Sequence, residues 1–218
     1  MRDAEVRENT DCISRLLMKQ DNGRYGITNL GALLIAHKLS SYPSLRKRIL
    51  RVVEYNRPGN LGIIEDMSFD TGYALALPKA EAAIMSLLPT EEYLDGAFRK
   101  RRQPYPKQAV RELLSNTVIH QNLSDAISGP LVCIYSNRIV FSNPGSSLIS
   151  TERILNAQPR TRNNLLAGLL RQIGLCEEGG SGWDIAVAAC EAEQIAAPEI
   201  QSDENLGNAG HDVRRQRI

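Results

Sequence analysis

The stretch from Lys107 to Asn143 constrains the fold most, because a helical pattern in it is followed at once by a strand pattern. Apolar residues recur at helical spacing between residues 107 and 120 and predict an amphipathic helix. The runs LVCIY and RIVFSN then flank a two-residue turn at Ser136-Asn137, which predicts a β-hairpin. Since such a helix buries its apolar face against a sheet, the pattern indicates an α/β protein.

The size and charge of the chain leave several functional classes open. Its 218 residues are enough for one large domain or two small ones. Twenty-six basic and twenty-five acidic residues give a net charge of +1, which indicates no particular partner. No apolar run approaches the roughly 18 residues needed to span a membrane, and the charged start MRDAEVRENTD does not resemble a signal peptide. We therefore expect a soluble, cytoplasmic protein without a membrane partner.

The cysteines are widely spaced and contain no CxxC pair. Such spacing fits neither a disulfide framework nor a zinc site, so we expect buried, reduced thiols at Cys12, Cys133, Cys176 and Cys190.

The amino-terminal half predicts a small lobe of alternating helices and strands. Thr28 can cap a helix over NLGALLIAHKLS that ends before Pro43. RILRVVEYN is β-branched and predicts a strand, and a second helix is expected over roughly Thr71–Leu88. We place this lobe at residues 1–98.

The segment Asp95–Pro106 changes character and predicts a connector between two lobes. It contains four consecutive basic residues, Arg99–Arg102, and two prolines. Clustered cations attract the phosphate backbone of nucleic acids, but four charges are equally typical of a solvated linker, and both interpretations stay open. A broader basic surface would also include Arg160, Arg162, Arg214, Arg215 and Arg217.

Three polar residues of the central helix, Glu112, Asn116 and His120, are spaced four apart and therefore share one face. A carboxylate and a carboxamide there could hold a water and a divalent cation beside a polyphosphate, because hard oxygen ligands suit magnesium. The alternative is that Glu112 and Asn116 are ordinary residues at the rim of a packed helix.

Glycines precede the last predicted helix, at Gly179-Gly180-Ser181-Gly182. Glycines let the backbone approach an anion, and the free N–H groups of a helix start attract negative charge. Taken alone, this segment and Asn143-Pro144-Gly145 at the end of a strand are simply turns. The chain contains no Walker A or Walker B pattern, so helicase activity is not expected.

The order of these elements is more specific than any one of them. A helix with E-x-x-x-N, a hairpin ending in N-P-G, a loop, a helix and a G-S-G turn resembles the GHKL ATPases, which include gyrase, the MutL mismatch-repair proteins and sensor histidine kinases. YPKQAVRELLSNTVIHQNLS, RIVFSNPG, RNNLLAGLLRQIGLCEEGGSGWDIA and AAPEI more closely resemble the divergent RecG-related helicase C-terminal family. That family occurs in predicted transcriptional regulators with an amino-terminal Schlafen-type, AlbA-like DNA-binding domain. The resemblance covers about residues 20–200.

The resemblance implies a two-layer sandwich of helices on a mixed, Bergerat-like sheet at residues 99–201, preceded by the small α/β linker lobe. Glu112 would polarise the attacking water, and Asn116 would ligate magnesium. Residues 146–162 would form a lid over the nucleotide. The nucleotide itself would contact Asn116, Asn143, Gly145, Gly180, Ser181 and Gly182.

Two departures from the family pattern weaken the expectation of hydrolysis. Asn143 stands where the GHKL ATPases have an acid that accepts a hydrogen bond from adenine, and a neutral amide accepts that bond more weakly. The common H-R-D-Y after the first helix is His120-Gln121-Asn122-Leu123 here, and we expect His120 to be structural.

The expected function is an ATP-binding module of a DNA-linked regulator, with slow magnesium-dependent hydrolysis. Two alternatives stay open: a degenerate dimerisation or partner-binding domain without turnover, and a truncated remnant. ATP, magnesium, a second copy, and DNA through a missing amino-terminal domain are the expected ligands and partners. Residues 202–218 lack an apolar pattern and predict an irregular tail, which suggests a truncated or frameshifted reading frame.

Overall fold

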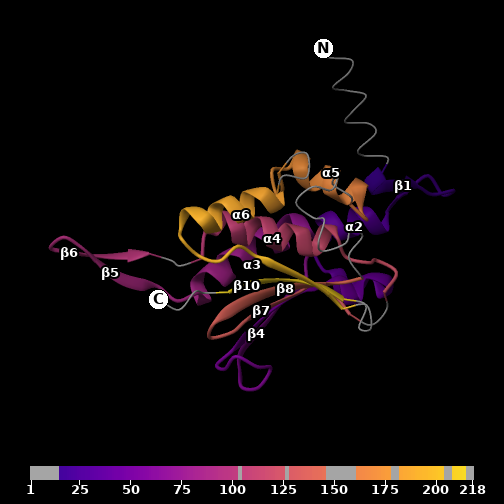
Figure 1. Ribbon diagram of the computed structural model, residues 1–218. Coiled ribbons are helices and arrows are strands. Elements are labelled where there is room, and N and C mark those ends of the chain that lie inside the picture. The colour runs from indigo at the N-terminus through magenta and orange to yellow at the C-terminus, as the bar shows by residue number, and fades with distance from the viewer. Residues whose placement is uncertain are drawn as a thin grey trace, which may run out of the picture.

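In the computed structural model, helices cover one face of a six-stranded mixed sheet (Figure 1). The structure describes residues 15–102, 105–125, 128–145, 161–177, 182–203 and 208–214. The predicted fold class, helices on a mixed sheet, is therefore confirmed. None of the described helices is both long and apolar enough to cross a membrane.

The sheet has the strand order β4-β3-β7-β8-β10-β9. Four of the five neighbouring pairs are antiparallel, and β3 and β7 form the one parallel pair of this sheet. A parallel pair needs a long crossover, which here contains two helices and a projecting hairpin. The strands are β3 (Leu50–Tyr55), β4 (Ile63–Phe69), β7 (Leu131–Ile134), β8 (Arg138–Pro144), β9 (Glu199–Asp203) and β10 (Asn208–Arg214).

The helices begin close to the predicted positions, but not all of them end there. Thr28 caps α2, its hydroxyl accepting from the Gly31 N–H at 3.0 Å, but α2 ends at Ile35, before the predicted Pro43. Gly174, with φ of 71°, ends α5 by donating its N–H to the Arg171 carbonyl. The helices are α2 (Asn29–Ile35), α3 (Tyr73–Leu87), α4 (Lys107–Ile119), α5 (Asn164–Gln172) and α6 (Gly182–Ala192), with 3-10 turns at Leu39–Ser41 and Pro43–Arg48 and a small hairpin of β1 (Leu17–Lys19) and β2 (Tyr25–Ile27).

One apolar core runs through both halves of the chain. Val110, Leu113 and Val118 of α4 are buried with Phe141 of β8 and with Val52 of β3. Because β3 pairs directly with β7, the sheet continues across the predicted lobe boundary at residue 98. The two halves share a sheet as well as a core.

The carboxyl-terminal segment differs from the irregular tail that the sequence predicted. β10 pairs with β8 along its whole length, from Asn208↔Pro144 to Arg214↔Arg138, and β9 pairs with β10. Strand pairing satisfies backbone N–H and C=O groups whatever the side chains are. A segment without apolar alternation can therefore still extend a sheet.

The predicted connector also contains regular structure. β5 (Glu91–Asp95) and β6 (Phe98–Arg102) form a two-stranded hairpin with Gly96 at its turn, where φ is 62°. Figure 1 shows this hairpin projecting from the body beyond the helices. The basic run Arg99–Arg102 thus lies on a strand.

Candidate functional site

The Glu112 carboxylate on α4 is one of four buried side chains in the described part of the chain that have a polar atom without a hydrogen-bond partner; the others are Arg48, Thr71 and Asn143. Glu112 is only 2% exposed, and its Oε1 has no hydrogen-bond partner. Burial raises the pKa of this carboxyl, and the nearby charge of Glu177 raises it further, while Arg111 and the backbone N–H of Glu177 act in the opposite direction. Buried polar atoms nearly always have a hydrogen-bond partner, so an unpaired carboxylate oxygen indicates a candidate ligand-binding site.

Asn116 and Gly182 lie beside this carboxylate. Asn116 is half-buried, one turn further along α4, and Gly182 begins α6. A Cβ on Gly182 would lie 2.8 Å from Oε2 of Glu112 and 4.0 Å from Nδ2 of Asn116. The structure therefore brings these three predicted site residues together, whereas Gly180 and Ser181 lie outside the described residues.

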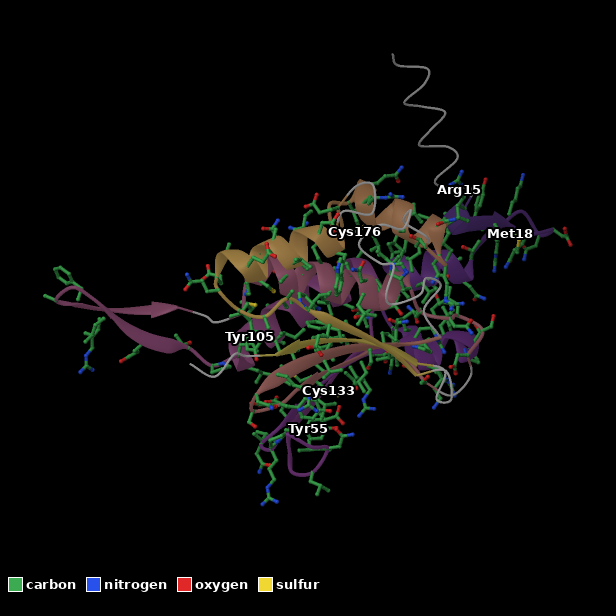
Figure 2. All side chains as sticks on the ribbon, in the orientation of Figure 1. Arg15, Met18, Tyr55, Tyr105, Cys133 and Cys176 are labelled. Carbon is green, nitrogen blue, oxygen red and sulfur yellow. The ribbon has the colours of Figure 1, made fainter. Side chains whose placement is uncertain are left out.

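Hydrogen bonds from α4 fix the segment that leads to the glycine turn. A guanidinium nitrogen of Arg111 donates to the Gly174 carbonyl at 2.5 Å, and Oγ of Ser115 donates to the Leu175 carbonyl at 2.7 Å. In Figure 2, Cys176 lies in this segment beside α5, and its Sγ is 3.6 Å from the Ala167 carbonyl oxygen. Arg111 and Ser115 of α4 thus hold the backbone at Gly174 and Leu175, in the segment between α5 and α6.

Arg111, Ser115 and Glu177 were missed by the sequence interpretation. Arg111 and Ser115 are four residues apart on α4, and Ser115 follows Glu112 by three, so Ser115 could have been expected beside both of them. Nothing in the local sequence places Glu177 against α4, because that contact depends on the packing of the α5–α6 connection.

The end of β8 forms a second polar position. Asn143 is 2% exposed; its Nδ2 donates to the Pro144 carbonyl at 3.3 Å, and its Oδ1 has no partner. Gly145 has φ of +103°, and a Cβ there would lie 2.9 Å from Cβ of Asn122 and 3.4 Å from the Arg162 guanidinium. An amide oxygen free to accept a hydrogen bond is thus held beside a crowded glycine.

His120 forms the carboxyl-terminal cap of α4. Burial lowers the pKa of its imidazole, and the positive charge of Arg162 lowers it further. Both effects favour the neutral imidazole. The structural role expected for His120 stays a prediction. The predicted lid, residues 146–162, falls outside the described residues except for residues 161 and 162.

A buried arginine from the first half of the chain supports the loop after α4. Arg48 is 1% exposed and donates to the carbonyls of Asn122 (3.0 Å), Ser128 (2.9 Å) and Asp125, and to Oε1 of Gln121 at 3.3 Å. The N–H of Asn122 in turn donates to the Pro144 carbonyl at 2.6 Å. Arg48 thereby helps to position the end of β8.

The three described cysteines are free thiols, as predicted; Cys133 and Cys190 are buried, whereas Cys176 is only half-buried. Cys12 lies outside the described residues. Burial raises the pKa of Cys176 and of Cys190 to about 11. Cys133 lies on the sheet, on the far side of the helices from Cys176 (Figure 2). Raised thiol pKa values favour the protonated form, which is the less reactive form of a cysteine.

Comparison with known proteins supports the resemblance drawn from the motifs. Residues 128–207 match the family described as "Putative ATP-dependent DNA helicase recG C-terminal". This match includes β7, β8, α5 and α6 and begins after α4, so Glu112 and Asn116 precede it. None of the curated proteins compared with the chain matches it.

A solved structure shares the fold. The DIP2311 protein from Corynebacterium diphtheriae superposes with a TM-score of 0.74 at 20% sequence identity, over 91% of this chain. The chain spans 39% of the length of that protein. At this identity the likeness concerns the fold alone.

Proposed function

We propose that this chain, an ATPase-like module whose residues 128–207 match the RecG C-terminal family, binds ATP with magnesium between α4, the start of α6 and the end of β8. The observation that carries the proposal is the buried Glu112 carboxylate, whose Oε1 is unpaired beside Asn116 and Gly182. Burying such a group has a substantial free-energy cost that a packed core alone does not explain.

The donor set fits a magnesium–polyphosphate ligand. The Asn116 side-chain oxygen is a hard ligand of the kind magnesium prefers, and Glu112 would accept a proton from a water at its unpaired oxygen. The start of α6 supplies backbone N–H groups and partial positive charge for phosphates, where we also place Gly180, Ser181 and Gly182. Bound magnesium would neutralise phosphate charge and polarise the terminal phosphoryl group.

We assign recognition of the adenine base of ATP to the end of β8. The unpaired Oδ1 of Asn143 can accept a hydrogen bond from the exocyclic amino group of adenine, and Gly145 would let the nucleotide approach the backbone. Because a neutral amide accepts more weakly than a carboxylate, discrimination against guanine is expected to be modest. We further propose that the module serves a DNA-linked regulator.

A second candidate is nucleotide binding without turnover, in a module that serves dimerisation or partner binding. The raised pKa of Glu112 favours it, since a higher pKa lowers the fraction of ionised carboxylate that could act as a general base. Hydrolysis and binding must therefore be measured separately.

The test uses Trp183, the single tryptophan of the chain, which directly follows Gly182. We expect ATP with magnesium to change its fluorescence saturably, and Asn116→Ala to weaken binding at least tenfold, about 1.4 kcal/mol. Gln108→Ala, an exposed change on the same helix, is the matched control and should bind like the native protein.

The other outcomes are equally informative. No binding by any variant at millimolar nucleotide would refute the proposed function, and equal binding by native protein and Asn116→Ala would refute the role of Asn116. Phosphate release is measured in parallel with Glu112→Gln. Turnover by the native protein that is lost in this variant, with binding retained, selects hydrolysis over the second candidate.

A further inference from the structure

Helix α3 is apolar on two faces, and only one of them packs on the core. Its buried face includes Tyr73, Leu77 and Ile84. A second apolar row consists of Leu75, which is 50% exposed, the exposed Pro78 and Ala82, and the half-buried Met85. An exposed apolar helix face is typical of an interaction surface.

Part of this second row forms a groove. Pro78, Ala82 and Met85 line it together with Glu81 and Lys107, and its volume is about 330 Å³. Glu81 and Lys107 form an ion pair at 3.3 Å on its polar side. We call this surface the α3 groove; it offers apolar contact beside a carboxylate.

The projecting hairpin of β5 and β6, residues 91–102, has its own exposed apolar side chains. Near its turn, Leu94 is 72% and Phe98 is 74% exposed. An isolated two-stranded hairpin is at best marginally stable in water. Burial of these apolar side chains against another surface would stabilise it. We call residues 91–102 the arm.

We infer that the arm of one chain lies on the α3 groove of a second copy, and that the partner's arm does the same in return. The arm starts four residues after α3 ends at Leu87, and Tyr105 is buried at its base next to the start of α4. Figure 2 shows Tyr105 at this junction. The α3 groove lies close to the base of the arm. If two chains are related by a two-fold axis, their arms run antiparallel, and the tip of each arm would lie on the groove of the other copy.

Lengths and charges agree with this exchange. A five-residue strand extends about 17 Å, and the α3 row from residue 75 to residue 85 extends about 15 Å. Arg99, paired in register with Leu94, has a side chain that is 81% exposed and only loosely paired with Glu92 at 3.8 Å. In the proposed dimer its guanidinium would pair with the carboxylate of the partner's Glu81.

Two other occupants are disfavoured by the charges of the arm. Antiparallel edge pairing of β6 with its own copy would set the basic run Arg99–Arg102 against itself. Duplex DNA favours a strongly basic surface, whereas the arm's basic residues are nearly balanced by acidic ones, namely four (Arg99, Lys100, Arg101, Arg102) against three (Glu91, Glu92, Asp95). A second copy of this chain is the occupant that fits both the apolar and the charged contacts.

The first test is the oligomeric state of the full chain by sedimentation equilibrium. We expect a dimer whose Kd rises at least tenfold in Leu94→Ser/Phe98→Ser and in Ala82→Glu. Leu61→Ser/Ile63→Ser removes two other exposed apolar side chains, 72% and 57% exposed, and should leave the Kd unchanged. Thermal melting of every variant verifies that the fold is intact.

The second test asks whether arm and groove meet between chains. Mixing the Phe98→Cys chain with the Ala82→Cys chain and oxidising should give a covalent dimer that neither chain gives alone, while Phe98→Cys mixed with Leu61→Cys should not. Because dimerisation depends on chain concentration, a monomer at about 100 µM would overturn the inference. So would a dimer that the tip and groove variants leave unaffected. A monomer that retains duplex DNA at low salt through Phe98 and Arg99 would assign the arm to nucleic acid instead.

Discussion

Glu112 is a single residue that should lower the stability of the free protein, and a role in ligand binding would explain why it is buried there. Its carboxylate is buried, one oxygen is unpaired, and the charge of Glu177 is close. Groups arranged for ligand binding often destabilise the free protein. The pH dependence of stability is therefore a direct test of this site that requires no ligand.

We expect Glu112→Gln to stabilise the free protein at pH 8. The pKa of Glu112 is raised in the folded state, mainly by burial, so its contribution to stability is fully present below the pKa of an unfolded glutamate, about 4.3. That contribution is lost as the pH rises through the folded pKa. The difference in Tm between variant and native protein should thus grow from pH 4 to pH 8.

Thermal melts followed by circular dichroism at several pH values provide the measurement. The exposed Glu193→Gln is the control and should follow the native curve. If the Tm difference for Glu112→Gln stays constant over this range, the carboxyl does not titrate as the structure indicates.

At the scale of elements, α4 and the β3–β7 junction organise the molecule. The apolar stripe of α4 packs on the sheet, while its polar face holds Glu112 and Asn116. The parallel pair β3–β7 joins the halves of the sheet, and the Arg51 N–H donates to the Pro130 carbonyl at its start. Close backbone approach at this junction requires a glycine just before β7.

Gly129→Ala should destabilise the protein by about 2 kcal/mol, within the usual range for overpacking. A Cβ at residue 129 would overlap the backbone carbonyl oxygen of Lys47, which cannot move aside as a flexible side chain can. Urea unfolding measures the change in free energy of unfolding. Gly59→Ala, where a Cβ would meet nothing within 4 Å, should change the midpoint little; equal effects of both changes would contradict the tight junction.

At the scale of the whole molecule, the two halves of the chain are joined by the sheet and by Arg48. The Arg48 guanidinium, whose pKa is lowered mainly by burial, donates to Gln121, Asn122, Asp125 and Ser128 across the predicted boundary. The buried hydroxyl of Tyr73 donates to the Arg48 carbonyl at 2.7 Å. Both halves should therefore unfold together.

Arg48→Met should lower the stability reported by Trp183 in the other half of the chain. The variant leaves several buried acceptors without a donor, which we expect to cost about 3 kcal/mol. Trp183 fluorescence and circular dichroism should still give one coincident transition, shifted to lower temperature. Lys47→Met, an exposed neighbour, is the control; a Trp183 transition unmoved by Arg48→Met would show that the halves unfold independently.

The sequence by itself determined the elements that have a local signature. Helical spacing predicted α4, β-branched runs around Ser136-Asn137 predicted the β7–β8 hairpin, and Thr28 marked the start of α2. It also placed Glu112 and Asn116 on one helix face, because four residues are close to one helical turn.

Only the tertiary structure decided which of these elements meet. The pairing of β10 with β8, the parallel contact of β3 with β7, the burial of Arg48 and the approach of Glu177 to Glu112 join residues far apart in the chain. Contacts of this kind depend on shared backbone hydrogen bonds and on the packing of one core, which leave no periodic pattern in the residues concerned. The segment after residue 202, unremarkable as a sequence, becomes part of the sheet because β8 offers it an open edge.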